Sequence, residues 1–220
     1  MDFPYLHIPL LFRILTLIRK QDCRLISFKP NAIFLVHTVI DELINEEPSI
    51  QLGRIRMIFL VMGVSGSGKT TLGRLLASRL NCSFLEGDDF HCTENIKKMT
   101  AGTPLNDTDR IPWLKSISFA VQQKNSKNQS CVVGCSALKR RYRQLILSNI
   151  DQYQLIYLKG QMQKISARMK ARSHFMPIEL LKSQFDTLEP PLPEENALVV
   201  DVSVEVEECL DYILKQLKFP

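Results

Sequence analysis

The chain lacks the sequence features of small zinc-binding domains, of disulfide-rich proteins and of membrane-spanning proteins. Its six cysteines include no C-x-x-C pair, and no Cys and His residues have zinc-finger spacing, which excludes a zinc module of that kind and a thioredoxin-type motif. We expect structural thiols in a reducing compartment. Neither the roughly 20 continuous apolar residues of a transmembrane helix nor any internal repeat is found, so a membrane protein and a repeat array are not indicated.

Residues 1–55 are poor in acidic side chains. Between Phe3 and Ile40 the only one is Asp22, beside five Lys and Arg residues. The apolar stretch from Phe3 to Ile18 is short, contains two prolines, and lacks a clear cleavage site for secretion. We expect a poorly ordered or loosely docked extension in a cytoplasmic protein. Two alternatives stay open: a mitochondrial import signal, and translation that starts at Met57.

The remaining residues, 56–220, are enough for one domain with a sizeable core. Apolar residues make up 45% of the chain, and the formal net charge is +5. A charge of this size suits small anionic ligands and does not by itself indicate nucleic acid.

A phosphate-binding loop is the strongest signal. An apolar, strand-length run, Met57–Met62, leads into a segment whose first eight residues fit G-x-x-x-x-G-K-[ST]. In this pattern, glycines let backbone N–H groups turn toward one anion, the lysine reaches terminal phosphates, and the hydroxyl ligates Mg²⁺. The sequence therefore predicts ATP and Mg²⁺ as cofactors, with Thr70 on the metal. The expected nucleotide-binding residues are Gly63, Val64, Ser65, Gly66, Ser67, Gly68, Lys69, Thr70 and Thr71.

Strand and helix patterns alternate after this loop, which predicts an α/β fold with a parallel sheet and helices on both faces. Ligands of such sheets bind beyond the carboxyl ends of the strands. Strands are expected at residues 56–62, 82–86, 131–135, 154–159 and 198–202. Helices are expected at 69–80, 93–100 with Thr93 as cap, from near Pro112 to 124, 138–147, 161–172, from Pro177 to 188, and at the C-terminus from Val206.

Two clusters of polar residues are candidates for the substrate site, one directly after the second predicted strand and one in a short loop. The second strand ends in Glu86-Gly87-Asp88-Asp89-Phe90-His91, where carboxylates could accept hydrogen bonds from a polyhydroxylated substrate and one could take its proton. A solvated acidic turn is the plain alternative. The second cluster crowds Asn106, Asp107, Asp109 and Arg110 into a short loop, although an ordinary capped helix start would also explain it. Arg110 offers a fork of donors for a carboxylate or a phosphate.

These blocks resemble the gluconokinases of the shikimate-kinase-like P-loop group. The resemblance runs from about Met57 to the C-terminus and is carried by Met62–Thr70, Gly87–His91, Pro104–Asp107 with Asp109–Leu114, Cys135-Ser136-Ala137-Leu138-Lys139, His174–Pro177 and Ser183–Pro191. It implies a three-layer P-loop kinase fold with a helical lid at about residues 160–190, often dimeric. It also implies transfer of the γ-phosphoryl group of ATP to the 6-hydroxyl of D-gluconate, with Mg²⁺.

On this basis we assign roles to the site residues. Lys69, Asp88 and Arg110 are the expected catalytic residues, and Asp88, Asp89, His91, Arg110 and Lys139 the expected substrate contacts. Arg168 and Arg172 are expected to close over the phosphates. The chain departs from its relatives in the lid, because Arg168–Phe175 is one residue shorter than their pattern and lacks a glycine before His174. Gln144, where relatives tend to have an acidic residue, is interpreted as a surface change.

Three alternatives stay open. Other small-molecule P-loop kinases, acting on shikimate or nucleoside monophosphates, share the phosphate loop. The basic run Lys139–Arg143, with Tyr142 inside it, would suit an RNA-binding P-loop protein or a polynucleotide kinase. A catalytically dead binding module is the third. The acidic turn and Arg110 favour a small polyol acid, with neither nucleic acid nor a membrane as partner.

Overall fold

The computed structural model describes residues 56–170 and 179–217. The predicted extension at residues 1–55, Arg172 and the start of the second lid helix at Pro177 lie outside these ranges. The described residues belong to one compact unit, Ser49–Pro220.

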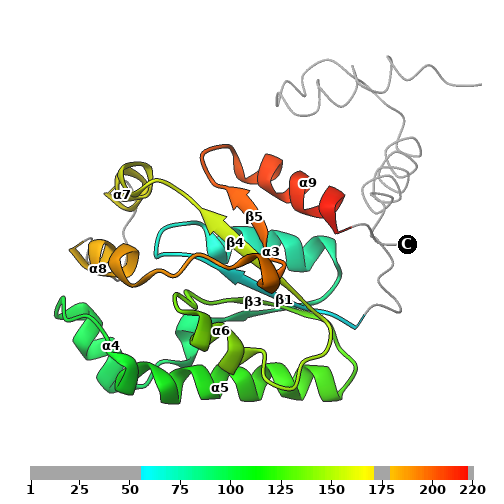
Figure 1. Ribbon diagram of the computed structural model, residues 1–220, viewed down its shortest axis with the longest axis horizontal. Helices are drawn as coiled ribbons and strands as arrows, with labels where there is room; N and C mark the ends of the chain where they lie inside the picture. Colours follow the sequence, from blue (N-terminus) through cyan, green and yellow to red (C-terminus); the bar gives the residue numbers. More distant parts are fainter. Residues whose placement is uncertain (1–55, 171–178, 218–220) are drawn as a thin grey trace, which may run out of the picture. The chain divides into compact units, whose positions relative to one another are not determined.

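A five-stranded sheet forms the centre of this unit (Figure 1). Its order is β2-β3-β1-β4-β5, and every neighbouring pair is parallel. The central strand β1 is buried at all five positions, as its continuous apolar sequence predicts. The strands are β1 (Ile58–Met62), β2 (Ser83–Glu86), β3 (Cys131–Gly134), β4 (Tyr153–Lys159) and β5 (Leu198–Asp201).

Helices cover both faces of the sheet, so the predicted three-layer α/β architecture is confirmed (Figure 1). Leu60 and its even-numbered neighbours in β1 pack on α5 (Asp107–Ser126) and α6 (Arg140–Ile146). Phe59 and Val61 face the other way, toward α3 (Lys69–Arg79) and α9 (Val206–Gln216). The alternation follows from the two-residue period of a strand.

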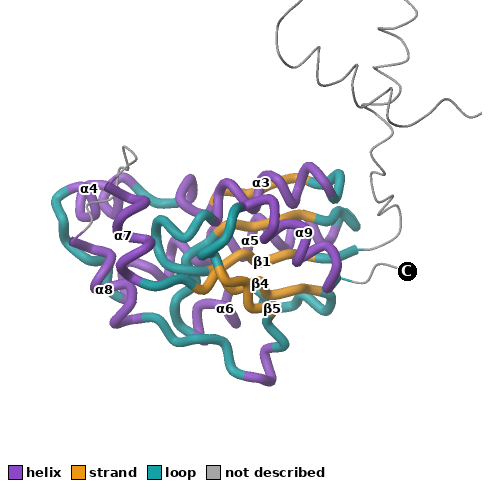
Figure 2. The backbone as a smooth tube through the Cα atoms, turned by 90° about the horizontal axis from the view of Figure 1, so that it is seen from above, coloured by secondary structure: helices purple, strands orange, loops and turns teal. Residues whose placement is uncertain are grey.

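A group of smaller elements lies at the carboxyl end of the strands, where both views place α4, α7 and α8 (Figures 1 and 2). The 3₁₀ helix η1 (Gly87–Phe90) continues directly from β2, and η2 (Pro193–Glu195) precedes β5. The helices of this end are α4 (Thr93–Thr100), α7 (Met162–Lys170) and α8 (Glu179–Thr187).

Several predicted boundaries were wrong. Helix α5 begins at Asp107 and not near Pro112, because Asn106 and Asp109 form a reciprocal capping box that starts the helix earlier. It also continues into the predicted loop as far as Ser126. Helix α4 is preceded by Cys92 as N-cap, so Thr93 is its first helical residue and not its cap.

Helices α3 and α9 pack on the sheet through apolar residues. In α3, Leu72 and Leu76 are buried, as is Leu80 just after it, but Leu75 is 37% exposed. In α9, Leu210 and Ile213 are buried against β5 and α3, and Val206 packs against the same cluster.

Candidate active site

The phosphate loop has the backbone geometry that an anion cradle requires. Gly63, Gly66 and Gly68 all have positive φ, at 146°, 76° and 98°, which side chains rarely adopt. A Cβ at Gly66 would lie 2.5 Å from Cγ of Met169 on α7, so this turn and α7 are closely packed. The loop runs directly into α3, whose first turn leaves backbone N–H groups without helical partners. These groups and the helix dipole favour an anion here.

Two polar side chains of the loop, Ser67 and Lys69, are placed where a bound phosphate could pair with them. The Oγ atom of Ser67 is buried and has no hydrogen-bond partner within the described ranges 56–170 and 179–217. Lys69 folds back, and its Nζ donates to the carbonyl of Val64 at 3.0 Å. Burial lowers the pKa of Lys69, and the nearby Asp88 carboxylate opposes that shift. A phosphate would supply both the missing acceptor and the missing negative charge.

A cleft of about 370 Å³ opens from the loop and has the size of a nucleotide site. Gly66–Thr71 form its floor, and the exposed side chain of Arg168 on α7 borders it. Its far wall comes from the segment between β5 and α9 and from the first turn of α9, neither of which was predicted from the sequence to belong to the site. That wall consists of Val202, Val204, Glu205, Val206 and Cys209.

A second, smaller cavity lies on the other side of the loop. Its volume is about 30 Å³, room for little more than one or two water molecules. Three residues, Ser65, Lys69 and Asp88, line both this cavity and the nucleotide cleft. The remaining walls are His91, Met99, Pro104, Leu105, Arg110, Trp113, Ser136, Leu180, Ser183 and Gln184.

Asp88 therefore stands where the two cavities meet. It belongs to η1, whose position is fixed by a hydrogen bond of 2.7 Å from Nε1 of Trp113 to the carbonyl of Gly87. Gly87 cannot carry a side chain, because a Cβ there would lie 2.4 Å from the carbonyl oxygen of Gly134. Asp89, the neighbouring carboxylate, is exposed and lines neither cavity.

His91 is a neutral wall of the small cavity. Its ring stacks on Trp113 with centroids 4.1 Å apart, and burial lowers its pKa to about 4. The amide of Asn95 lies 3.4 Å from Nδ1 and also donates to the carbonyl of Asp109. Because that amide nitrogen is a donor, the ring proton is assigned to Nε2, which lies 4.0 Å from Asp88.

Arg110 is a buried cation on the opposite wall. Only 8% of the residue is exposed, and its Nε donates to the carbonyl of Leu105 at 3.1 Å. No carboxylate among the described residues forms an ion pair with it. A buried guanidinium without an anion is costly unless a ligand supplies one.

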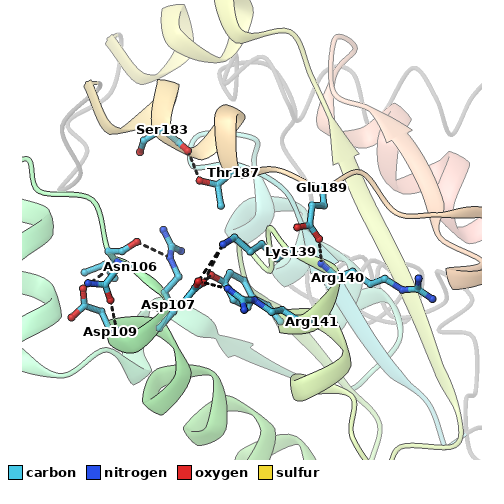
Figure 3. Close-up of polar contacts among 12 residues, drawn as sticks. Asn106, Asp107, Asp109, Lys139, Arg140, Arg141, Ser183, Thr187 and Glu189 are labelled. Carbon is cyan, nitrogen blue, oxygen red and sulfur yellow. Dashed lines mark hydrogen bonds and ion pairs between the residues drawn. The ribbon is translucent and has the colours of Figure 1, made fainter.

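The other residues of the second polar cluster hold the fold together. Asn106 and Asp109 cap α5, and Asp109 also pairs with Lys98. Asp107 accepts from Lys139 at 3.2 Å, and Arg141 and Tyr142 also contact it (Figure 3). Lys139, an expected substrate contact, is thus directed at Asp107 and lines neither cavity.

The rest of the basic run is also paired internally. Arg143 is 1% exposed and forms two hydrogen bonds to the Glu195 carboxylate, at 2.6 and 2.7 Å. Arg140 pairs with Glu194, and its backbone N–H donates to Glu189 (Figure 3). A run neutralised in this way does not offer the free cations that phosphate tracking requires. The geometry therefore disfavours the nucleic-acid alternative.

Helix α8 roofs the small cavity with Leu180, Ser183 and Gln184. Gln184 is buried, and its Oε1 accepts a hydrogen bond of 2.7 Å from the backbone N–H of Ser65. Gln184 was not predicted as a site residue, although it lies within Ser183–Pro191, one of the motifs that carry the resemblance.

The described parts of the chain contain no group of three His, Cys, Asp or Glu side chains placed to hold a metal ion. That fits Mg²⁺, which usually binds through one or two protein groups plus phosphate oxygens and water. Thr70 is exposed on the nucleotide cleft, where such an ion would be held. Among residues 56–170 and 179–217, no helix is both long and apolar enough to cross a bilayer.

A parallel sheet with a phosphate loop between β1 and α3, and with two cavities that meet at that loop, defines a P-loop kinase of small molecules. A shikimate kinase family profile matches residues 65–218. The thermosensitive gluconokinase of Escherichia coli (strain K12) is 41% identical over 162 residues, or 71% of this chain and 87% of the relative. A probable gluconokinase of Xenopus tropicalis is 42% identical over 173 residues, 71% of this chain and 91% of the relative.

Solved structures agree. A gluconokinase from Sinorhizobium meliloti 1021 superposes with a TM-score of 0.68 at 40% identity, covering 74% of this chain and 93% of that one. The chain belongs to the shikimate-kinase family of P-loop kinases and, within it, to the gluconokinases.

Proposed function

We propose that this protein transfers the γ-phosphoryl group of ATP to the 6-hydroxyl of D-gluconate, giving 6-phospho-D-gluconate and ADP. The observation that carries the proposal is the shared wall of Ser65, Lys69 and Asp88 between a nucleotide-sized cleft and a second cavity. Membership in the gluconokinase family supplies the acceptor.

The nucleotide side is the phosphate loop with α3. Backbone N–H groups of Gly66–Thr71 would surround the phosphates, and Lys69 would leave the Val64 carbonyl to neutralise their charge. Thr70 would hold Mg²⁺, which would offset the negative charge of the transferring group. Arg168 borders the same cleft and could close over it; Arg172 is proposed for the same role from the sequence alone.

The acceptor side is built from Asp88, His91 and Arg110. Arg110 would pair with the gluconate carboxylate, which supplies the anion that the buried guanidinium lacks. Neutral His91 would donate from Nε2 to a substrate hydroxyl. Asp88 would accept the proton of the 6-hydroxyl. At the same time the oxygen of that hydroxyl would form a bond to the γ-phosphorus, and the bond between the γ-phosphorus and the departing ADP oxygen would break.

The acceptor cavity is small in this structure. Its volume of about 30 Å³ is less than a six-carbon acid needs, and we propose that α8, one of its walls, moves to admit the acceptor. Closure afterwards would exclude the water that would otherwise hydrolyse ATP. We further propose that the enzyme acts in the cytoplasm, as a homodimer in view of its resemblance to the gluconokinases, and without nucleic acid or a membrane as partner.

A panel of acceptors tests the proposal. ADP release is measured with ATP, Mg²⁺ and either gluconate, shikimate, glycerate or AMP. We expect the highest kcat/KM with gluconate, and an Asp88→Asn variant should lose most of that activity, on the order of a hundredfold. A higher kcat/KM with shikimate or AMP would assign the enzyme to another branch of the small-molecule P-loop kinases.

A further inference from the structure

Gln184 connects the roof of the acceptor cavity to the phosphate loop. Its Oε1 accepts the Ser65 N–H at 2.7 Å across a separation of 119 residues. The same side chain lines the acceptor cavity, whereas Ser65 lines both cavities. The bond therefore spans from the lid side of the acceptor site to the point where the phosphoryl group would pass.

The other contacts of α8 divide into two sets. Leu181 packs with Val64 of the phosphate loop, Leu138, and Ile165 and Met169 of α7. Among residues 56–170 and 179–217, Leu180 packs with Met99 and Leu105 in a small cluster on the far side of the acceptor cavity. On this side of α8, the buried hydrogen bond from the Ser65 N–H to Gln184 is a directional contact with the phosphate loop.

We propose that Gln184 is a positioning residue that latches α8 over the acceptor cavity and thereby couples acceptor binding to the phosphate loop. The inference rests on the proposed function for the identity of the acceptor alone. Breaking the bond lets α8 rise and the acceptor enter. Re-forming it expels water and returns Ser65 to its place between the cavities.

The chemistry of the side chain fits this role. A carboxamide accepts the amide hydrogen bond without adding negative charge near a phosphoryl group, which a carboxylate would repel. The Ser65 peptide does not need Gln184 for its fold, because the loop is also tied by bonds from the N–H of Ser67 and from Lys69 to the carbonyl of Val64. Loss of Gln184 should therefore disturb closure more than nucleotide binding.

Gln184→Met tests the latch, since it keeps the volume and removes the acceptor. The readout is the number of phosphorylated acceptor molecules formed per ADP released, measured together with kcat, both KM values and ATP hydrolysis without acceptor. We expect a fall in kcat of roughly tenfold or more, because the loss of the hydrogen bond from Ser65 alone corresponds to about that factor. The product-to-ADP ratio should fall below that of the wild type, with KM for ATP within about threefold, because Gln184 does not line the nucleotide cleft.

Two further variants complete the design. Gln184→Glu keeps an oxygen for the Ser65 N–H, so its product-to-ADP ratio should match the wild type although kcat falls through charge repulsion. Lys182→Met is the matched control, because Lys182 is exposed on the same helix and, among the residues that the structure describes, pairs with Asp186. It should match the wild type in every measurement. Should Gln184→Met fail to fold, Gln184→Asn replaces it, since its shorter side chain withdraws the carboxamide by about 1.5 Å.

An unchanged product-to-ADP ratio and kcat in folded Gln184→Met would overturn the latch, as would an equal fall of the ratio in Gln184→Glu or Lys182→Met. The comparison is made with whichever acceptor of the panel the wild type uses best. A wild type that prefers shikimate, glycerate or AMP to gluconate thus counts against the proposed function and leaves the Gln184 comparison intact.

Discussion

Replacing Arg110 by Met should make the free enzyme more stable and the reaction much slower. Arg110 is buried, and no carboxylate of the described residues pairs with it. In the free protein a hydrogen bond to the Leu105 carbonyl compensates this buried charge only in part, and Met fills a similar space without charge. With substrate bound, the same guanidinium would meet the gluconate carboxylate.

The two effects can be given magnitudes. The variant loses the hydrogen bond from Nε to Leu105, which costs about 1–2 kcal/mol, and it escapes a desolvation penalty of several kcal/mol. We expect a net stabilisation of about 1 kcal/mol, which raises Tm by about 2–4 °C for a domain of this size. Loss of the charge-assisted pair should weaken gluconate binding by about 3 kcal/mol, or roughly a hundredfold.

Trp113 makes the binding measurement direct. It is the only tryptophan of the chain, and it lines the acceptor cavity, so its fluorescence should report gluconate binding. Titrations of Arg110→Met are compared with Lys115→Met, which removes one positive charge from the exposed face of the same helix. Calorimetry gives Tm for both. The control should leave the gluconate Kd unchanged.

Arg110 could pair with the carboxylate of the acceptor or with the transferring phosphoryl group, and an uncharged polyol separates these two roles. If it pairs with the carboxylate, sorbitol should bind equally weakly to wild type and variant. The reasoning is refuted if Arg110→Met binds gluconate as the wild type does, or if its Tm falls by more than about 4 °C, which would mark Arg110 as a structural residue.

Four further predictions follow from the same geometry. Lys69→Ala should lower kcat by about a hundredfold or more in steady-state assays, because it removes a stabiliser of transferring charge; near-normal turnover would remove the loop lysine from the mechanism. His91 has a folded-state pKa lowered to about 4. Below its ordinary value of about 6.5 the unfolded chain takes up the proton and the folded chain does not, so stability should fall by about 3 kcal/mol from pH 7 to pH 4. His91→Phe keeps an aromatic ring on Trp113 but has no group that titrates, so its free energy of unfolding, measured with urea, should lack that part of the fall. Parallel curves of unfolding free energy against pH for variant and wild type would contradict the prediction. Arg168→Ala should lower kcat with less change in ATP affinity if the cleft closes over the phosphates during transfer; equal loss in both would place Arg168 in ground-state binding. A chain that begins at Met57 should melt and turn over like the full chain, and a large drop in Tm would show that the preceding residues stabilise the domain.

Local signals account for the parts that the sequence predicted well. The strand before Gly63, the loop itself and the start of α3 follow one another within about twenty residues, so propensity and glycine placement were enough to predict them. The alternation of strands and helices then implied the parallel sheet. The start of α5 was predicted too late, because proline is common in the first turn of a helix and Pro112 was taken to mark it. The reciprocal hydrogen bonds of Asn106 and Asp109 begin the helix earlier.

The rest of the site depends on contacts between distant segments. Nothing local to Gln184 indicates that it bonds to Ser65, and nothing local to Lys139 or Arg143 indicates that Asp107 and Glu195 neutralise them. The sequence pattern could therefore group Arg110 with its neighbours but could not tell which of them face the acceptor cavity.

The central claim is tested most directly by the position of the phosphate in the product. The wild-type enzyme is incubated with ATP, Mg²⁺ and D-gluconate, and the product is examined by phosphorus–proton correlation NMR while ADP is counted. The account predicts one product per ADP, with phosphorus coupled to the protons on carbon 6. The absence of a gluconate-dependent product, or a phosphate on any other oxygen, would contradict it.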